Sequence, residues 1–351
     1  MADTGAGAGR AFIGSFTSAG GRGIVTAAVD PATGALTETG VTDAVADPSY
    51  LAAVATPAGP VLYAVSETED GGVAAFDATG AAPRPIGRRM SVGGSGPTHI
   101  SVSQGHLLTA NYGSGSVSVV PVGTDGAPGP VGGVMRHEGD GPVRDRQAEP
   151  HAHQVLPDPT GRWVLSVDLG TDSVRICALD TAADALTPHH ETALRPGTGP
   201  RQLAFHPDGR HVYVLGELKP EVTVCRWDVA AGLLEPVAET AVVPEGTTGP
   251  AYPSALVVSP DGRHLWAAVR GHDSIAVLSL DGTGERAALV ANVPCGGHWP
   301  RDLALDPTGR RLYAANERSG DVTWFALDPE TGIPGPVGSF PVPAASCVVF
   351  A

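Results

Sequence analysis

The chain has 351 residues, of which 47 are glycine and 32 are proline, while only 5% are aromatic. This composition predicts many tight turns and favours short strands over long helices. Apolar residues make up 42% of the chain, which is enough to bury a core and excludes a largely disordered protein. The formal net charge of −15 makes nucleic acid and anionic membranes poor partners.

The first residues carry no recognisable targeting signal. Met1–Arg10 lacks the apolar run of a secretory signal, and no stretch reaches the roughly 18 apolar residues that cross a bilayer. We therefore expect a cytoplasmic protein with a flexible N-terminus at residues 1–9 and a single domain at residues 10–351. The cysteines form no C-x-x-C pair, which favours reduced, mostly buried thiols over disulfides or a zinc site. They are Cys177, Cys225, Cys295 and Cys347.

The first third of the chain contains imperfect copies of a repeated strand unit, whose clearest copies lie in the second half of the chain. Residues 10–36 predict strands that resemble the later part of one unit, and residues 48–76 and 97–120 supply two more. Apolar residues alternate with polar ones in these strands, and this period of two indicates one buried face.

The segment from Gly132 to Pro150 is the longest departure from the repeat. Loops of this length without structure of their own are often functional in a compact domain. A solvated, charged surface excursion is the alternative, and the sequence favours neither.

The second half of the chain contains the clearest copies. Each reads as an apolar strand, a D-P-x-G-R or P-D-G-R turn and a second apolar strand, followed by an alternating third strand and a fourth. Proline presets φ and glycine accepts a positive φ, so each turn predicts a hairpin. The turn glycines recur about every 50 residues, a period typical of propeller blades. They are Gly161, Gly209, Gly262 and Gly309.

The repeat predicts an all-β fold, a seven-bladed β-propeller. The segment Ser346–Phe350 supplies a lone strand, and its pairing with the N-terminal blade would close the ring and remove the open sheet edges. Six or eight blades would require one unit to be merged or split. A propeller needs no partner to close, so we expect a monomer.

Polar residues that break the apolar pattern recur at two positions of the repeat. Copies of one position face the same rim or the axis, so these residues are expected to cluster, although any one could instead cap a strand or turn. The first position precedes the innermost strands, at Tyr50, His99, His151, His153, Arg201, Tyr252, Ser254, His298 and Arg301. The second follows the second strands, at Glu67, Asn111, Asp168, Glu217, Arg270, Asn316 and Glu317.

Common catalytic and ligand-binding motifs are missing from the sequence. There is no G-x-S-x-G elbow, H-E-x-x-H helix, Walker loop or complete dinucleotide fingerprint. His151 and His153 could face one side of a strand, but the sequence offers no clear third metal ligand. We therefore expect neither a metal nor a cofactor.

The sequence resembles the lactonase family of seven-bladed propellers, which includes bacterial 6-phosphogluconolactonase and fungal carboxymuconate-cyclising enzymes. The likeness covers nearly the whole chain. Its most specific segments are DPSYLA, LTANYGSGSVSV, EPHAHQVLPDPTGRWVLSVDLGTD, GPRQLAFHPDGRHVYVLGEL and WPRDLALDPTGRRLYAANE. The resemblance implies a metal-independent lactonase of carbohydrate metabolism whose central channel uses His153, Arg201, Glu217 and Arg270.

These four residue types suit lactone hydrolysis. His153 could act as general base, while Glu217 could orient it or take the base role itself. Arg201 and Arg270 could hold a carboxylate or phosphate and stabilise the oxyanion. The substrate-binding residues expected around them are His151, His99, Asn111, Tyr50, Glu67, His298 and Arg301.

Two departures from the family pattern leave the substrate open. Val269 precedes Arg270 where the family often has a small residue plus asparagine, and Gln154 stands where a further histidine is common. A small anionic or sugar-derived lactone is the expected substrate. A carboxymuconate-type cycloisomerase or another biosynthetic cyclisation enzyme remains an alternative, as does a non-catalytic binding propeller.

Overall fold

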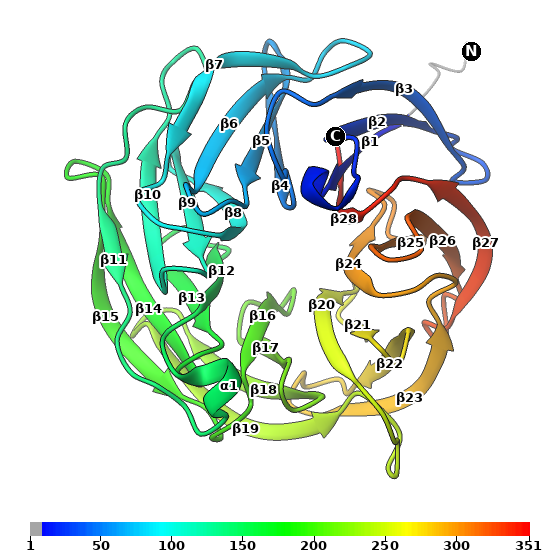
Figure 1. Cartoon of the computed structure of the whole chain (residues 1–351). Helices are drawn as coiled ribbons and strands as arrows, with labels where there is room; N and C mark the ends of the chain where they lie inside the picture. The colour runs from blue at the N-terminus through cyan, green and yellow to red at the C-terminus, as the bar shows by residue number, and fades with distance from the viewer. Residues whose placement is uncertain (1–8) are drawn as a thin grey trace, which may run out of the picture.

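A computed structural model describes residues 9–351, which form seven four-stranded antiparallel sheets arranged as a ring. Apart from Gly9, which begins a strand, the predicted flexible N-terminus lies outside the described residues. The described chain is thus the predicted seven-bladed propeller (Figure 1).

Each blade runs from the axis to the perimeter, and Figure 1 shows the innermost strands around the centre of the ring. The innermost strands are β4 (Leu51–Thr56), β8 (Pro97–Ser103), β12 (Ala152–Pro157), β16 (Pro200–Phe205), β20 (Tyr252–Val258), β24 (Pro300–Leu305) and β28 (Ala345–Phe350). The second strands are β5 (Gly59–Ser66), β9 (His106–Asn111), β13 (Val164–Asp168), β17 (His211–Gly216), β21 (His264–Arg270), β25 (Arg311–Asn316) and β1 (Gly9–Ser15).

The third strands are mostly buried, whereas the outermost strands are largely exposed. The third strands are β6 (Gly72–Asp77), β10 (Ser116–Pro121), β14 (Ser173–Asp180), β18 (Glu221–Asp228), β22 (Ser274–Leu280), β26 (Asp321–Leu327) and β2 (Ile24–Val29). The outermost strands are β7 (Arg84–Ser91), β11 (Val134–Arg136), β15 (Ala185–Ala193), β19 (Leu233–Ala241), β23 (Ala287–Pro294), β27 (Pro334–Pro341) and β3 (Leu36–Thr42). We number the blades 1 to 7 in the order in which the innermost strands are given.

Blade 7 combines the two ends of the described chain. Strand β28 pairs antiparallel with β1, with Val348 opposite Ile13 and Val349 opposite Phe12. The predicted closure by the C-terminal strand is therefore confirmed. Because β28 covers the inner edge of β1, blade 7 has four paired strands like the other blades.

The hairpin turns form where the repeat predicts them. Gly161, Gly209, Gly262 and Gly309 have φ values between 67° and 71°, a region that side chains resist. The four cysteines are buried and free, as expected.

The core consists of apolar layers between neighbouring blades. The layer between blades 4 and 5, for example, includes Tyr213, Leu215, Leu265 and Val269. Buried polar tips reach the next blade, as where the Tyr213 hydroxyl donates to the Gly284 carbonyl at 2.9 Å. Such pairs satisfy the polar ends of large core residues and tie adjacent blades.

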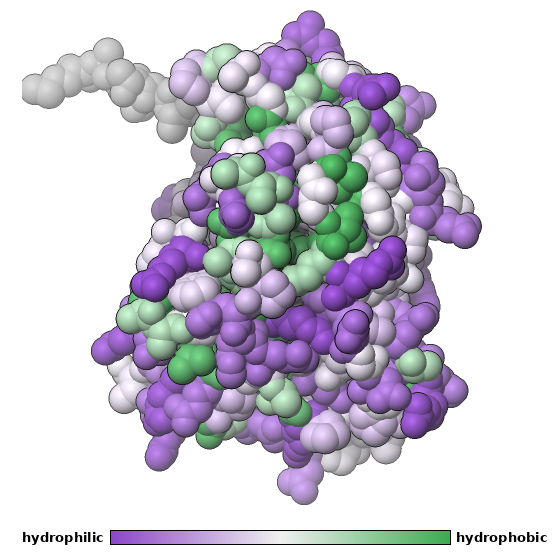
Figure 2. All heavy atoms as spheres, turned by 90° about the vertical axis from the view of Figure 1, so that its left-hand side faces the viewer, coloured by the Kyte–Doolittle hydropathy of each residue, from purple (hydrophilic) through white to green (hydrophobic). Residues whose placement is uncertain are grey.

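The perimeter is largely solvated. Side chains of β15 are mostly exposed, and Figure 2 shows a face where hydrophilic side chains predominate and apolar ones gather in a hollow near its centre. Within residues 9–351 no helix is long and apolar enough to cross a membrane.

The segment Gly132–Pro150 is more ordered than its sequence suggests. It contributes β11 to blade 2 and then the short helix α1 (Arg144–Gln147). A 3-10 helix, η1 (Thr17–Ala19), follows β1. Strand β11 shows no period in the sequence, because only three residues of the segment pair with β10.

Candidate active site

The innermost strands begin with an irregularity that turns side chains toward the axis. In six of them the pairing with the second strand skips one residue near the start, as in a β-bulge, which re-aims the unpaired side chain. The skipped residues are Thr98, His153, Arg201, Ser254, Arg301 and Ser346. All of these except Ser254 line one narrow cavity, together with Ser49, Tyr50, Glu67, His99 and Gln202.

A second ring of side chains comes from the ends of the second strands. Gly216 pairs with Pro200 and Asn316 with Pro300, so Glu217 and Glu317 occupy equivalent positions just beyond them. Arg270 takes this position in blade 5, where it pairs with Tyr252. The residues at the two predicted positions of the repeat thus lie close together, near the start of the innermost strands.

Glu217 is the centre of a buried ion cluster. Its Oε2 lies 2.6 Å from Arg270 Nη2 and 3.1 Å from Arg201 Nε. Its Oε1 lies 2.6 Å from Nη2 of Arg146, which comes from α1. Three guanidinium groups therefore share one carboxylate.

Backbone carbonyls hold the two inner arginines in place. Arg201 donates from Nη1 to the Ser254 carbonyl. Arg270 donates from Nε to the carbonyl of Tyr252 at 3.2 Å, and its guanidinium lies 5.6 Å from the centre of the Trp299 ring. Planar guanidinium groups fixed in this way are preorganised to bind a carboxylate or an oxyanion.

The charges of the cluster shift each other's pKa. Burial alone would raise the pKa of Glu217, but Arg270, Arg201, His153 and Arg146 together hold it well below its usual range. Burial, and then the charge of Arg270, lower the pKa of Arg201 to about 9. Glu217 is therefore a permanent anion and a weak proton acceptor.

The histidines on the cavity wall are neutral. Burial, reinforced by the charge of Arg201, holds the pKa of His153 well below its usual value. The same two causes lower the pKa of His99 to about 3. His153 lies edge-on to the ring of Tyr112, with 5.5 Å between the ring centres.

Acidic and basic groups also line the opposite wall. Arg301 Nη1 lies 3.1 Å from Glu317 Oε2, and its guanidinium covers the Phe16 ring at 4.8 Å. Burial raises the pKa of Glu67, which accepts a hydrogen bond from the Ser49 hydroxyl. Neutral and charged groups thus face each other across the channel.

One protein-family model spans almost the whole chain. The model described as "Lactonase, 7-bladed beta-propeller" matches residues 10–350. The chain belongs to this lactonase family.

Relatives of the lactonase-family chain include proteins with named activities. This chain is 34% identical over 347 residues to a 6-phosphogluconolactonase of Bacillus subtilis, and the match covers 97% of each chain. A periplasmic gluconolactonase structure from Pseudomonas aeruginosa matches with a TM-score of 0.91 at 29% identity, covering 98% of this chain and 99% of that one. A Lactobacillus plantarum protein structure gives a TM-score of 0.92 at 27% identity, with coverage of 98% and 99%.

The four residues that the family resemblance implies lie together in this lactonase-family propeller. Arg201 and Arg270 contact Glu217 directly, and His153 lines the same cavity as Arg201. Of the expected substrate-binding residues, Tyr50, His99, Glu67 and Arg301 line this cavity as well.

Three other expected substrate-binding residues lie elsewhere. His151 stacks on the Tyr112 ring and donates from Nδ1 to the Tyr112 backbone carbonyl at 2.9 Å. Asn111 is fully buried in a hydroxyl network, where its Nδ2 donates to Ser118 Oγ at 2.8 Å. His298 is half-exposed and bonds to the Asp273 carboxylate.

Two residues of the site were missed in the sequence. Tyr112 follows Asn111 and takes the channel position that the polar pattern assigned to its neighbour. Arg146 comes from the segment outside the repeat, so it has no equivalent position in other blades from which it could have been predicted. The available signals were the irregular segment that contains it, Gly132–Pro150, and the arginine-rich stretch V-R-D-R-Q.

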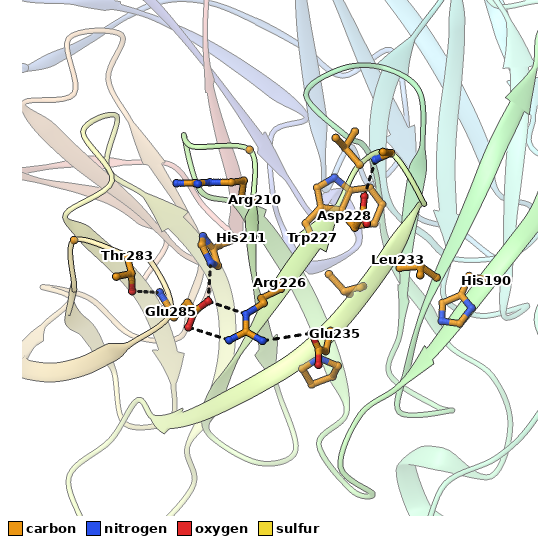
Figure 3. Close-up of a pocket in the computed structure, with 16 residues that line it drawn as sticks. His190, Arg210, His211, Arg226, Trp227, Asp228, Leu233, Glu235, Thr283 and Glu285 are labelled. Atoms are coloured by element: carbon orange, nitrogen blue, oxygen red, sulfur yellow. Dashed lines mark hydrogen bonds and ion pairs between the residues drawn. The ribbon is translucent and has the colours of Figure 1, made fainter.

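A second hollow lies on the outer face of blade 4, as an open groove of about 1100 Å³ (Figure 3). Its ionic groups pair with each other, as where Arg226 Nε lies 2.7 Å from Glu285 Oε1. Within residues 9–351, one histidine–carboxylate set has the spacing of metal ligands, and it lies beside this groove. The set is His206, Asp208 and His211.

That set is already occupied by internal hydrogen bonds. Nδ1 of His211 lies 2.8 Å from Asp208 Oδ2, and Nδ1 of His206 accepts from the Asp208 amide at 3.1 Å. His151 and His153 are not part of it. The channel therefore encloses His153 and Arg201 in a narrow cavity, whereas the outer groove is open and its ionic groups pair with each other.

Proposed function

We propose that this protein hydrolyses a small anionic or sugar-derived lactone in its central channel. One observation carries the proposal: neutral His153 and cationic Arg201 line one enclosed cavity, beside a carboxylate that fixes Arg201 and Arg270. The named activities of the relatives from Bacillus subtilis and Pseudomonas aeruginosa support the same substrate class.

In the proposed reaction, His153 accepts a proton from water as the water oxygen attacks the lactone carbonyl carbon. The neighbouring Glu217 anion stabilises the imidazolium that forms, because its charge raises the pKa of His153. Glu217 itself is held as an anion by its arginines, so His153 is the better candidate for the base. General-base catalysis of this kind contributes roughly 10²- to 10⁴-fold.

The arginines stabilise the negative charge that develops during the reaction. Arg201 or Arg270 stabilises the oxyanion of the tetrahedral intermediate, a type of interaction that is strong in a water-poor site. The ring C–O bond then breaks, and His153 returns its proton to the leaving alkoxide. The product carboxylic acid releases its remaining proton to solvent, and the same guanidinium groups hold the resulting carboxylate until it leaves.

The test is hydrolysis of 6-phosphogluconolactone and δ-gluconolactone in a pH-stat, corrected for spontaneous opening. His153→Ala and Arg201→Ala should each reduce kcat by about 10²-fold or more while remaining folded by circular dichroism. His190→Ala, which removes an exposed histidine of β15, is the matched control and should retain the wild-type rate. Background rates for the wild type, or full activity of His153→Ala, would refute the proposal.

A further inference from the structure

The channel is too narrow for a substrate as it stands. The cavity between the innermost strands has about 10 Å³ of space, roughly what one water molecule occupies. A lactone ring can enter only after at least one side chain near the cavity moves. The ion cluster adjoins this cavity through Arg201, which lines it and pairs with Glu217, and Glu217 in turn pairs with Arg146.

Arg146 is the least anchored arginine of the cluster. Its side chain is 37% exposed, against 5% for Arg201 and 8% for Arg270. Both of the latter also donate to backbone carbonyls of blade 5. Arg146 contacts Glu217 Oε1 at 2.6 Å and the Tyr112 hydroxyl at 3.4 Å.

The backbone beneath Arg146 is firmly held. The next residue, Gln147, is fully buried, and its Nε2 donates to the Leu169 carbonyl at 2.9 Å and to Asp172 Oδ1 at 2.8 Å. Its Oε1 accepts from the Val143 amide at 3.0 Å. The side chain of Arg146 can therefore swing while α1 remains in place.

The charge balance permits this movement. If Arg146 leaves, Glu217 is still paired with Arg201 and Arg270, so no buried carboxylate is left alone. The released guanidinium then needs a new anionic partner to compensate for the lost ion pair. Phosphate and carboxylate groups suit it, because the guanidinium fork binds them with two hydrogen bonds.

We propose that Arg146 closes the channel mouth in the free protein and transfers from Glu217 to an anionic substituent of the incoming lactone, remote from the reacting carbonyl. Arg146 is then a specificity-determining residue that favours lactones bearing a phosphate ester or a carboxylate over neutral ones. This inference rests on the proposed lactonase function and deepens it.

The test compares three lactones with Arg146→Ala, Arg146→Lys and the control Arg144→Ala. Arg144 lies on the same helix, is exposed and pairs only with exposed Asp140 among the described residues. The substrates are neutral δ-gluconolactone, glucaro-1,4-lactone with its free carboxylate, and 6-phosphogluconolactone. The two charged lactones separate a carboxylate preference from a phosphate preference.

Arg146→Ala should raise KM for at least one charged lactone about tenfold or more, the usual worth of a charge-assisted hydrogen bond. For δ-gluconolactone, KM should stay the same or fall, because the mouth is open. Arg146→Lys should recover part of the loss, and Arg144→Ala should match the wild type. Equal losses for neutral and charged lactones, or no change for any, would overturn the inference.

Calorimetry with 6-phosphogluconate and gluconate separates this inference from the hydrolase proposal. Should the wild type hydrolyse no lactone, the hydrolase proposal fails, but Arg146 can still be tested by these stable ligands. Weakening of 6-phosphogluconate binding in Arg146→Ala, about tenfold more than that of gluconate, would support an anion-binding role. Unchanged binding, or no binding by the wild type, would overturn it.

Discussion

His153 gains its chemical character from the groups around it. Burial disfavours its charged form, Arg201 adds repulsion, and only Glu217 opposes these effects. An ordinary histidine would be half protonated near pH 6.5 and would lose its base function below that value. His153 instead keeps the neutral form needed to accept a proton.

We therefore expect kcat to remain constant as the pH falls through 6.5 and to decline only at lower pH, where His153 finally becomes protonated. Arg201→Gln removes a repulsive charge, so it should move the inflection in the residual rate to higher pH. The measurement is the pH–rate profile, with His190→Ala as the control. A wild-type inflection at or above pH 6.5 would contradict a depressed pKa for the base.

The sequence could identify single residues only where the repeat gave them a register. His153, Arg201, Glu217 and Arg270 stand at repeated positions, and the structure brings them together. Asn111 was one residue away from the channel position, because the turn after β9 begins with Tyr112. A strand end can shift by one residue without changing the apolar pattern.

Hydrogen bonds link several innermost strands to the next blade. In each of them, one polar side chain accepts a hydrogen bond from a backbone amide of the neighbouring innermost strand. Gln154 accepts from the Leu203 amide at 2.7 Å, and Gln202 accepts from the Leu256 amide at 3.1 Å. In blade 6 the equivalent residue is Asp302, which accepts from the Val348 amide at 3.0 Å. Its burial raises its pKa to about 7.

Asp302→Asn should keep this hydrogen bond and make stability less dependent on pH. The carboxyl has a folded pKa above its unfolded value near 3.9, so it stabilises the fold at low pH and loses that contribution as the pH rises through 7. Between pH 5.5 and 8 the wild type should lose about 2 kcal/mol more stability than the variant. Urea unfolding at both pH values measures this difference. An equal change in the free energy of unfolding for the wild type and the variant would refute the prediction.

The elements of the segment Gly132–Pro150 were the least predictable. Strand β11 has only three residues, and α1 has four. Neither is long enough to establish a period, and both are held by tertiary contacts such as those of Gln147. Arg146 was therefore invisible as a site residue, although its segment stood out as irregular.

The ring as a whole was predictable because seven copies of one unit reinforce the same interpretation. Each hairpin leaves an apolar face that only a neighbouring blade can cover, as the layer between blades 4 and 5 illustrates. The last strand mattered most for this prediction. A lone strand at Ser346–Phe350 has no neighbour in sequence, so its partner had to come from the other end of the described chain.

Closure by β28 should determine whether the molecule folds at all. Ala345, Cys347 and Val348 are almost fully buried, and β28 also pairs along β1. Side chains buried in this way contribute about 1.5–3 kcal/mol each for the larger ones, against a total stability of about 5–15 kcal/mol for a typical domain. Deleting residues 345–351 should therefore abolish the cooperative unfolding transition.

Thermal and urea unfolding test this expectation, with deletion of Ala351 alone as the control. That deletion removes two backbone hydrogen bonds to Arg10 but no buried side chain, so it should lower the stability only slightly. A synthetic peptide of residues 344–351 should restore the transition in the truncated protein, because it can add back the missing strand along β1. Full stability without β28 would mean that blade 7 holds together through its other three strands. Rescue by the peptide would instead locate the weak point of the ring at the β28–β1 pairing.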